Sequence, residues 1–195
     1  MRLRRKLYRE LSMSIALEQR MVAAVQDCPA RLVPSGEPIV IPKNTFVTIT
    51  QARGGTYTVS YKGNLARVDG SDAEALGLEP EEIEYPDAQD GELRESYIWD
   101  TLRTVYDPEI PVSIVDLGLV YGVDIDKDVN GHGKVTVRMT LTAPGCGMGQ
   151  VLADDVRYRL KKVPNVDEVD VKLVFDPPWS RDMITEEAQL ELGIF

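Results

Sequence analysis

Residues 134–175 read KVTVRMTLTAPGCGMGQVLADDVRYRLKKVPNVDEVDVKLVF, and three successive patterns in them predict a strand, a helix and a second strand. Apolar and polar residues alternate over 134–142, which is the two-residue period of a half-buried strand. An apolar stripe at helical spacing follows, and a second strand is predicted over 169–175. The stripe consists of Leu152, Val156, Leu160 and Val163. Because a strand–helix–strand connection is almost always right-handed, the two strands should be parallel neighbours.

The flanking segments predict the rest of a C-terminal α+β domain. Residues 93–106 have helical spacing, and Asp107-Pro108 is expected to end that helix, since the residue before proline disfavours helical angles. Residues 119–125 predict a strand that a short loop joins to the next one, so this pair should be antiparallel. A last helix is predicted over 183–192. The predicted fold is a small mixed three-stranded sheet with helices on one face.

The N-terminal half predicts a small all-β domain in front of it. Four short segments are rich in β-branched and aromatic residues, and glycine-containing turns separate them. The predicted strands are residues 38–41, 46–51, 56–61 and 65–68. A short helix over 72–76, ended by Gly77, should follow them.

Composition divides the chain into four parts. Residues 1–24 form a basic N-terminal helix or tail, and residues 25–78 hold the β domain. Residues 79–91 are rich in proline and acidic side chains, which is typical of a solvated linker. Residues 92–195 form the C-terminal domain. No segment has the apolar length of a signal peptide or of a helix that spans a bilayer, so we expect no membrane association.

Charge and cysteine content exclude several classes of function. The chain has 195 residues, with 22 basic and 32 acidic side chains, a net charge of −10 and a pI near 4.7. A nucleic-acid-binding protein normally needs a basic surface for phosphate contacts, so that role is excluded. The chain has two cysteines, Cys28 and Cys146, in different predicted domains. They predict free thiols in a reducing, cytoplasmic compartment.

The segment from Thr140 to Gly149 carries the main candidate site. It joins the predicted strand to the helix, and Cys146 is expected in the first helical turn with three glycines around it. The positive end of the helix dipole would stabilise a thiolate there, as metal ligation and nucleophilic attack both require. The alternative is a small buried residue that fills the loop, since free cysteines are commonly buried.

A second candidate is Asp107-Pro-Glu-Ile-Pro111, which Asp116 follows. An acid at the C-terminal end of a helix is electrostatically unfavourable, because the dipole there is already negative. Asp107 is therefore a candidate for a functional carboxylate. The alternative is a turn-forming Asp-Pro pair with no further role.

Taken together, four motifs resemble a known family. The motifs are Asp107-Pro-Glu-Ile-Pro111, Asp116-Leu-Gly-Leu-Val-Tyr121, Thr142-Ala-Pro-Gly-Cys-Gly-Met148 and Asp176-Pro-Pro-Trp179. In this order and spacing they are similar to the small iron–sulfur cluster assembly domain family. Gly147, where other relatives have proline, favours the SufT-like branch with an extra N-terminal domain. The resemblance covers about residues 25–195.

The resemblance implies a maturation factor for iron–sulfur proteins of the SUF system, not an enzyme. The implied cargo is iron or an iron–sulfur cluster, held transiently and shared between the chains of a homodimer. The implied partners are the assembly machinery and client apo-proteins. The family's reactive cysteine, aspartate and threonine fall on Cys146, Asp107 and Thr142, with Glu109, Asp116, Gly145 and Gly147 as supporting residues and Cys28 as a second thiol of the branch.

Two other classes remain open from the residues alone. A thiol-dependent enzyme would need a general base. His132 is the only histidine, and it lies in an Asn-Gly-His-Gly sequence typical of an exposed hairpin tip. A protein–protein adaptor without metal would need exposed anchors. Trp179, after two prolines, is either such an anchor or a packed core aromatic.

Overall fold

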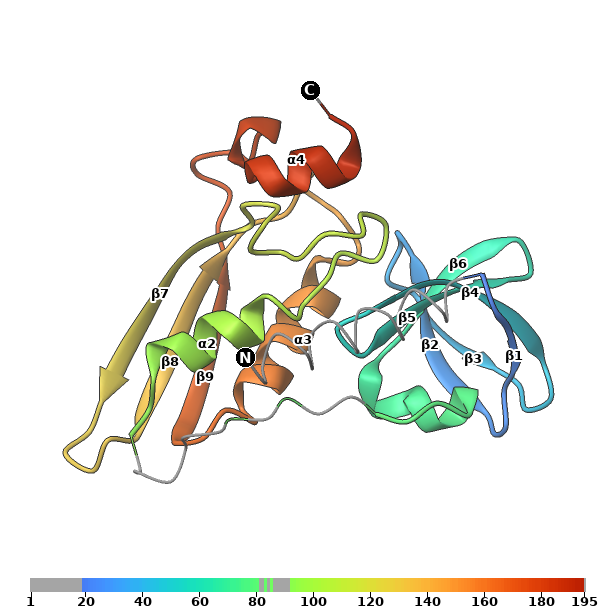
Figure 1. Cartoon of the computed structure of the whole chain (residues 1–195), viewed down its shortest axis with the longest axis horizontal. Coiled ribbons are helices and arrows are strands. Elements are labelled where there is room, and N and C mark those ends of the chain that lie inside the picture. Colours follow the sequence, from blue (N-terminus) through green and yellow to red (C-terminus); the bar gives the residue numbers. More distant parts are fainter. Residues whose placement is uncertain (1–18, 81–82, 84, 86–91, 195) are drawn as a thin grey trace. The chain divides into compact units, whose positions relative to one another are not determined.

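The computed structural model describes residues 19–80, 83, 85 and 92–194 (Figure 1). The chain divides into unit 1, Met1–Glu82 with Pro108–Pro111, and unit 2, Ile83–Asp107 with Val112–Phe195. The predicted basic tail up to residue 18, and most of the predicted linker, lie outside the described residues. Within the described ranges, no helix is long and apolar enough to cross a membrane.

Unit 1 contains a six-stranded antiparallel sheet in the order β1-β4-β5-β6-β2-β3. The strands are β1 (Met21–Ala23), β2 (Cys28–Val33), β3 (Pro38–Ile41), β4 (Phe46–Arg53), β5 (Thr56–Tyr61) and β6 (Asn64–Val68). The sequence pattern predicts the last four of these but not β1 and β2. β1 is short and lies before the expected domain start at residue 25, yet it pairs with β4, with Val22 opposite Val47.

Turns and core packing in unit 1 follow the expected chemistry. Gly54 and Gly55 both have positive φ (53° and 73°), as the hairpin between β4 and β5 requires. The predicted short helix is a 3-10 helix, η1 (Gly70–Leu76), and Gly77 ends it in the left-handed conformation. The core of the unit is apolar, and its fully buried members include Cys28, Ile41, Ile49, Val59, Ala66 and Val68.

Unit 2 contains a three-stranded sheet in the order β7-β8-β9. β7 (Val120–Lys127) is antiparallel to β8 (Gly133–Met139), and β8 is parallel to β9 (Val166–Leu173). Helix α3 (Gly149–Leu160) forms the crossover between the parallel strands. The predicted mixed sheet is therefore present.

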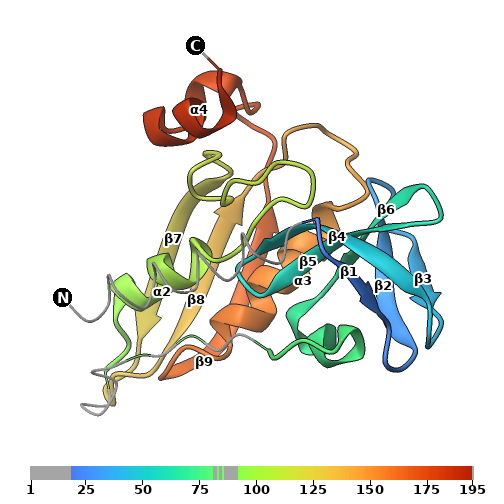
Figure 2. The same cartoon turned by 45° about the vertical axis from the view of Figure 1, so that its right-hand side comes forward.

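Helices α2 (Glu95–Leu102) and α3 lie side by side against one face of this sheet (Figures 1 and 2). The side chains of β8 alternate accordingly: Val135, Val137 and Met139 are fully buried, whereas Arg138 is exposed. The last helix, α4 (Glu186–Leu192), is capped at its N-terminus by Thr185, whose side chain accepts a hydrogen bond from the Ala188 amide.

The predicted helix over 93–106 is too long. α2 ends at Leu102, and the next amides form tighter bonds, Thr104 N to Thr101 O and Val105 N to Leu102 O. The chain then becomes extended, since Tyr106 pairs with Ser113 in an isolated antiparallel bridge. Asp107-Pro108 therefore does not end the helix, because the helix has ended five residues earlier.

The sheet topology brings the motif segments to one end of unit 2. β7 starts where the parallel strands β8 and β9 finish, so the loops before β7 and after β8 and β9 leave the same sheet edge. Two backbone bonds join these loops: Thr140 N to Leu119 O at 2.8 Å and Val174 N to Met139 O at 2.9 Å. Helix α4 lies at this end of the sheet (Figure 1).

Candidate functional site

Cys146 lies between two turns that connect β8 to α3. Its amide bonds to the Ala143 carbonyl (3.3 Å), and its carbonyl accepts from the Gly149 amide (3.1 Å). α3 begins at Gly149, so the expected position of Cys146 inside the first helical turn is wrong.

Cys146 nevertheless keeps part of its surface exposed. The residue is half-buried, and its neighbours Gly145 and Gly147 are exposed, so the buried loop-filling alternative does not apply. Gly145 has φ +84°, and a Cβ atom there would meet nothing within 4 Å. Glycine is therefore needed at 145 for backbone direction alone. At Gly149, by contrast, a Cβ atom would overlap the Leu141 side chain, because the first residue of α3 packs directly against that side chain.

Asp107 lies in the extended turn after α2 and is 9% exposed. Its amide donates weakly to Val112 O (3.4 Å), and Ile114 N bonds to Val105 O (2.9 Å) across the same turn. The helix-dipole argument for a functional Asp107 does not hold, because no helix ends at this residue. What remains is a carboxylate with little exposed surface. Glu109 is exposed in the Pro108–Pro111 segment, which is part of unit 1.

Asp116 belongs to a compact turn that precedes β7. The Ser113 hydroxyl donates to Asp116 Oδ2 (2.7 Å) and also accepts from the Asp116 amide (3.1 Å). Thr142, two residues beyond the buried Thr140, is half-buried at the start of the Cys146 loop. The Thr140 hydroxyl is itself buried without a hydrogen-bond partner in the described part of the chain.

The candidate ligands do not form a complete metal site. Among residues 19–80, 83, 85 and 92–194, no group of three or more histidine, cysteine or acidic side chains is arranged to hold a metal ion. Cys146 therefore does not join two of the predicted carboxylates in one ligand set. Any species that Cys146 binds needs further ligands from elsewhere.

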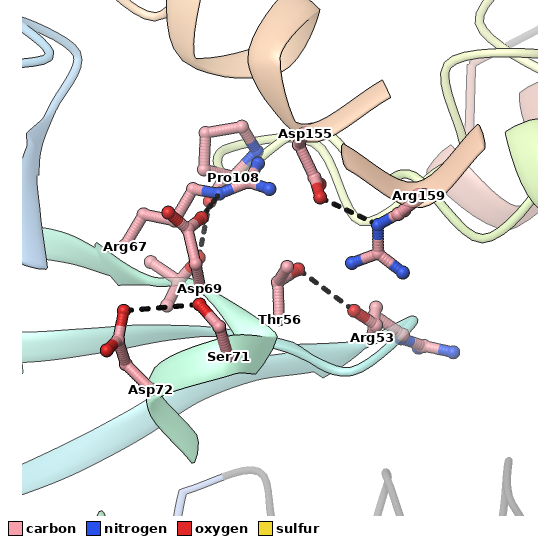
Figure 3. A network of polar contacts seen from close by, with 10 residues as sticks. Arg53, Thr56, Arg67, Asp69, Ser71, Asp72, Pro108, Asp155 and Arg159 are labelled. Atoms are coloured by element: carbon pink, nitrogen blue, oxygen red, sulfur yellow. Dashed lines mark hydrogen bonds and ion pairs between the residues drawn. The ribbon is translucent and has the colours of Figure 1, made fainter. Parts of the chain in front are cut away.

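Cys28, the second predicted thiol, lies in the core of unit 1 with no exposed surface. Burial, and to a smaller extent the nearby Asp72 carboxylate, raise the pKa of Cys28 to about 11. Asp72 accepts a hydrogen bond from Ser71 (Figure 3), yet burial and the Asp69 charge still raise the pKa of its carboxyl. The Cys28 thiol is therefore protonated at neutral pH and shielded from metal or reagents.

His132 lies where the sequence predicts it, in the hairpin loop between β7 and β8. Its Nδ1 is 3.1 Å from Asp167 Oδ1, and both side chains are substantially exposed. The hairpin precedes β8 and the Cys146 loop follows it, so seven strand residues, roughly 20 Å, separate them. His132 therefore cannot serve as the base for the Cys146 thiol.

Sequence reasoning missed the hydrogen bond that Trp179 forms. Trp179 is half-buried, and its indole Nε1 donates to the Leu117 carbonyl at 2.8 Å. It is thus neither a free anchor nor a fully packed core ring. The Pro-Pro-Trp sequence marks a loop, but it gives no indication of a partner 62 positions earlier.

Fold and site together define unit 2 as a small α+β domain that presents a half-exposed cysteine at the carboxyl end of a parallel strand pair. A family described as iron-sulfur cluster assembly protein matches residues 95–172. An Fe-S protein maturation auxiliary factor of Porphyromonas gingivalis is 53% identical over 92 residues, which are 47% of this chain and 84% of that protein. The chain belongs to the iron–sulfur cluster assembly protein family.

A second curated relative supports the same assignment, and a solved structure is similar in sequence. The Fe-S protein maturation auxiliary factor SufT of Staphylococcus aureus is 42% identical over 90 residues, covering 46% of this chain and 98% of that protein. A crystal structure of a DUF59 domain of unknown function from Bacillus anthracis, 39% identical, covers 52% of this chain and 92% of its own, with a TM-score of 0.45. The predicted family and its SufT-like character are confirmed.

The comparisons cover only part of the stretch over which the motifs suggest a resemblance. The family match begins at residue 95, so it does not include the β strands of unit 1. Because the matched stretch makes up 98% of the S. aureus protein, that relative has no room for both units. The likeness of residues 25–94 to the extra domain of the SufT-like branch stays a prediction.

Proposed function

We propose that this chain is a maturation factor for iron–sulfur proteins that handles iron or an iron–sulfur cluster as cargo through the Cys146 thiol. The observation that carries the proposal is the 53% identity with an Fe-S protein maturation auxiliary factor, which extends over 84% of that protein's length. The partly exposed Cys146 supports it, because Cys28 has no exposed surface.

The small number of candidate ligands favours transient binding of the iron or cluster over its storage. A conventional iron–sulfur cluster needs four thiolates, whereas the described part of the chain has no site with even three metal-ligating side chains. The missing ligands would come from Cys146 of a second copy, from a carboxylate such as Asp107, or from the client apo-protein. Incomplete ligation suits a donor, because a donor must release what it carries.

The remaining predicted residues support this centre in different ways. Gly145 gives the loop its direction, and Thr142 and Asp116 lie on segments that leave the same sheet edge as Cys146. Both cysteines are free, in keeping with the proposed reducing, cytoplasmic location. Proposed partners are the assembly machinery and client apo-proteins.

Anaerobic reconstitution tests the proposal directly. Wild type, Cys146→Ser and the matched control Cys28→Ser are incubated with ferrous iron and sulfide, then desalted and mixed with an apo-dehydratase that needs a four-iron cluster. We expect bound iron per chain and client activation to fall at least tenfold in Cys146→Ser and to stay within twofold of wild type in Cys28→Ser.

The outcomes distinguish the three proposed functions: thiol-based transfer, an adaptor without cargo and a thiol-dependent enzyme. If Cys146→Ser loads and activates the client like wild type, thiol-based handling is wrong. If no protein binds iron but client activation in cell extract still depends on Cys146, the chain acts as an adaptor without cargo. A His132→Ala variant should be silent in every arm, because His132 lies at the far end of β8.

A further inference from the structure

We propose that Trp179 is a positioning residue that holds the Asp116 turn, residues 113–118, against the sheet edge from which the Cys146 loop leaves. This inference rests on the proposed function, because it assigns Trp179 a part in the same thiol-dependent transfer. Trp179 ends the Asp176-Pro-Pro-Trp179 motif, which follows the stretch 95–172 that the family model matches. Its part is to fix backbone rather than to bind cargo.

The C-terminal segment after β9 is tied to the Asp116 turn at two of the turn's carbonyl groups. The Trp179 indole Nε1 donates to Leu117 O at 2.8 Å. The Thr185 amide donates to Asp116 O at 2.9 Å. Leu117 is fully buried, so its carbonyl has little access to water. Without the indole N–H, this oxygen would lose its side-chain partner and the turn would loosen.

Close packing holds the same segment in place. Gly118 has φ +69°, and a Cβ atom there would overlap the Met183 carbonyl oxygen. The two backbones therefore approach as closely as glycine permits. From β7, the Tyr121 hydroxyl donates to Pro177 O at 2.8 Å and contacts Met183 Sδ at 3.7 Å. The segment cannot shift without disturbing these contacts.

A backbone path leads from the Asp116 turn to the Cys146 loop. The turn is internally bonded, with Leu117 N to Ser113 O at 2.9 Å and Leu119 N to Ile114 O at 2.9 Å. Leu119 O in turn accepts from Thr140 N at 2.8 Å. Thr140 directly precedes the Leu-Thr pair that opens the Cys146 loop. Displacement of the turn should therefore move this loop relative to the carboxylate of Asp116.

The chain has two tryptophans, and removing Trp99 allows the N–H group of Trp179 to be altered alone. Trp99 lies in α2, where its Nε1 donates to Glu95 Oε1 at 3.1 Å. Trp99→Phe therefore serves as the parent protein and as the control for loss of an indole elsewhere. In that background Trp179 is the sole tryptophan. Growth on 3-benzothienylalanine then replaces only its N–H by sulfur, and growth on 5-fluorotryptophan keeps the N–H as the conservative rescue.

Two readouts are compared between these proteins. Hydrogen exchange of the Gly118 and Thr185 amides, measured without any cargo, should be about tenfold faster in the benzothienyl protein. The maximal rate of transfer to the apo-dehydratase should fall three- to tenfold, with an unchanged half-saturating client concentration. The fluorotryptophan protein should match Trp99→Phe in both readouts.

The results distinguish failure of this inference from failure of the proposed function. Equal exchange and equal transfer rates in the two analogue proteins overturn the positioning role, whatever Cys146→Ser does. Faster exchange with an unchanged transfer rate overturns it as well, because the turn would then be structural only. If Cys146→Ser transfers normally, the proposed function fails, while the exchange data still report whether Trp179 holds the turn.

Discussion

In unit 1, Cys28 starts a strand and has no exposed surface, whereas in unit 2 Cys146 lies half-exposed between two turns. The strand environment raises the pKa of the Cys28 thiol to about 11 and surrounds it with apolar side chains. The loop environment of Cys146 has exposed glycines on both sides. The same residue type is thus a packing element in one unit and a partly exposed loop residue in the other.

Thiol alkylation should show the largest difference between the units. With iodoacetamide at pH 8, we expect Cys146 in the folded protein to react at least about a hundredfold faster than Cys28, because a thiol of pKa 11 is ionised in roughly one molecule in a thousand at this pH. Mass spectrometry of the peptides over time measures both rates. In urea the rates should converge, and folded-state rates within tenfold of each other would contradict the contrast.

Serine substitution should separate function from stability in the two units. Cys146→Ser should abolish client activation and change the free energy of unfolding by less than about 0.5 kcal/mol, as expected for a surface position. Cys28→Ser should keep activation but destabilise unit 1 by about 1–3 kcal/mol, because a hydroxyl replaces a thiol in an apolar core. Urea unfolding and client assays on the same preparations provide the comparison. Loss of activation in both variants would remove the distinction.

Much of unit 2 could be predicted because its signals are local. The alternation over 134–142 and the helical stripe give β8 and α3, and connection rules give the parallel partner. β1 and β2 escape prediction for the opposite reason. β1 has three residues and β2 contains a proline at its second position, so neither shows the alternation of apolar and polar residues that would indicate a strand.

The geometry of the candidate site was harder to predict from the sequence than the identity of the candidate residues. The motif residues lie on loops that one sheet edge gathers, and topology alone implies that arrangement. The offset of Cys146 from α3 depends on two successive turns, and the end of α2 depends on tight bonds at Thr104 and Val105. The bond from Trp179 to Leu117 joins distant positions, so no local pattern contains it.

Two glycines with similar backbone angles should respond differently to alanine. Gly63, in the β5–β6 turn of unit 1, has φ +81° and nothing within 4 Å of a Cβ; Gly118 in unit 2 has φ +69° and faces the Met183 carbonyl. Gly63→Ala should cost about 1 kcal/mol of unfolding free energy from backbone strain alone. Gly118→Ala should cost about 3 kcal/mol, because the Met183 backbone must also move.

Chemical denaturation of both variants measures these costs. Gly118→Ala should in addition accelerate hydrogen exchange at Thr185, whose amide bonds to Asp116 O, and Gly63→Ala should not. Equal destabilisation of the two variants would mean that the approach of Met183 to Gly118 is easily relaxed.

A further expected difference is a pH dependence of stability at the alkaline end, which develops gradually and only above pH 9. The folded pKa of Cys28, about 11, lies above its ordinary value of 9.0, so the folded thiol keeps its proton where the unfolded thiol loses it. Its contribution is complete below pH 9 and declines as the pH rises toward 11, by about 2 kcal/mol in all. Urea unfolding between pH 8 and 11 should therefore show unit 1 weakening from pH 9 upward.

Matched variants show which titrating group causes the decline of stability with pH. Cys28→Ala should lower stability at every pH but flatten the decline of unit 1, because no thiol remains to titrate. In unit 2, burial raises the pKa of Tyr85 above 10.0, so Tyr85→Phe should flatten a decline that begins a unit higher. A decline of unit 1 that persists unchanged in Cys28→Ala would contradict this assignment, because the buried thiol could then not be the group whose titration weakens the unit.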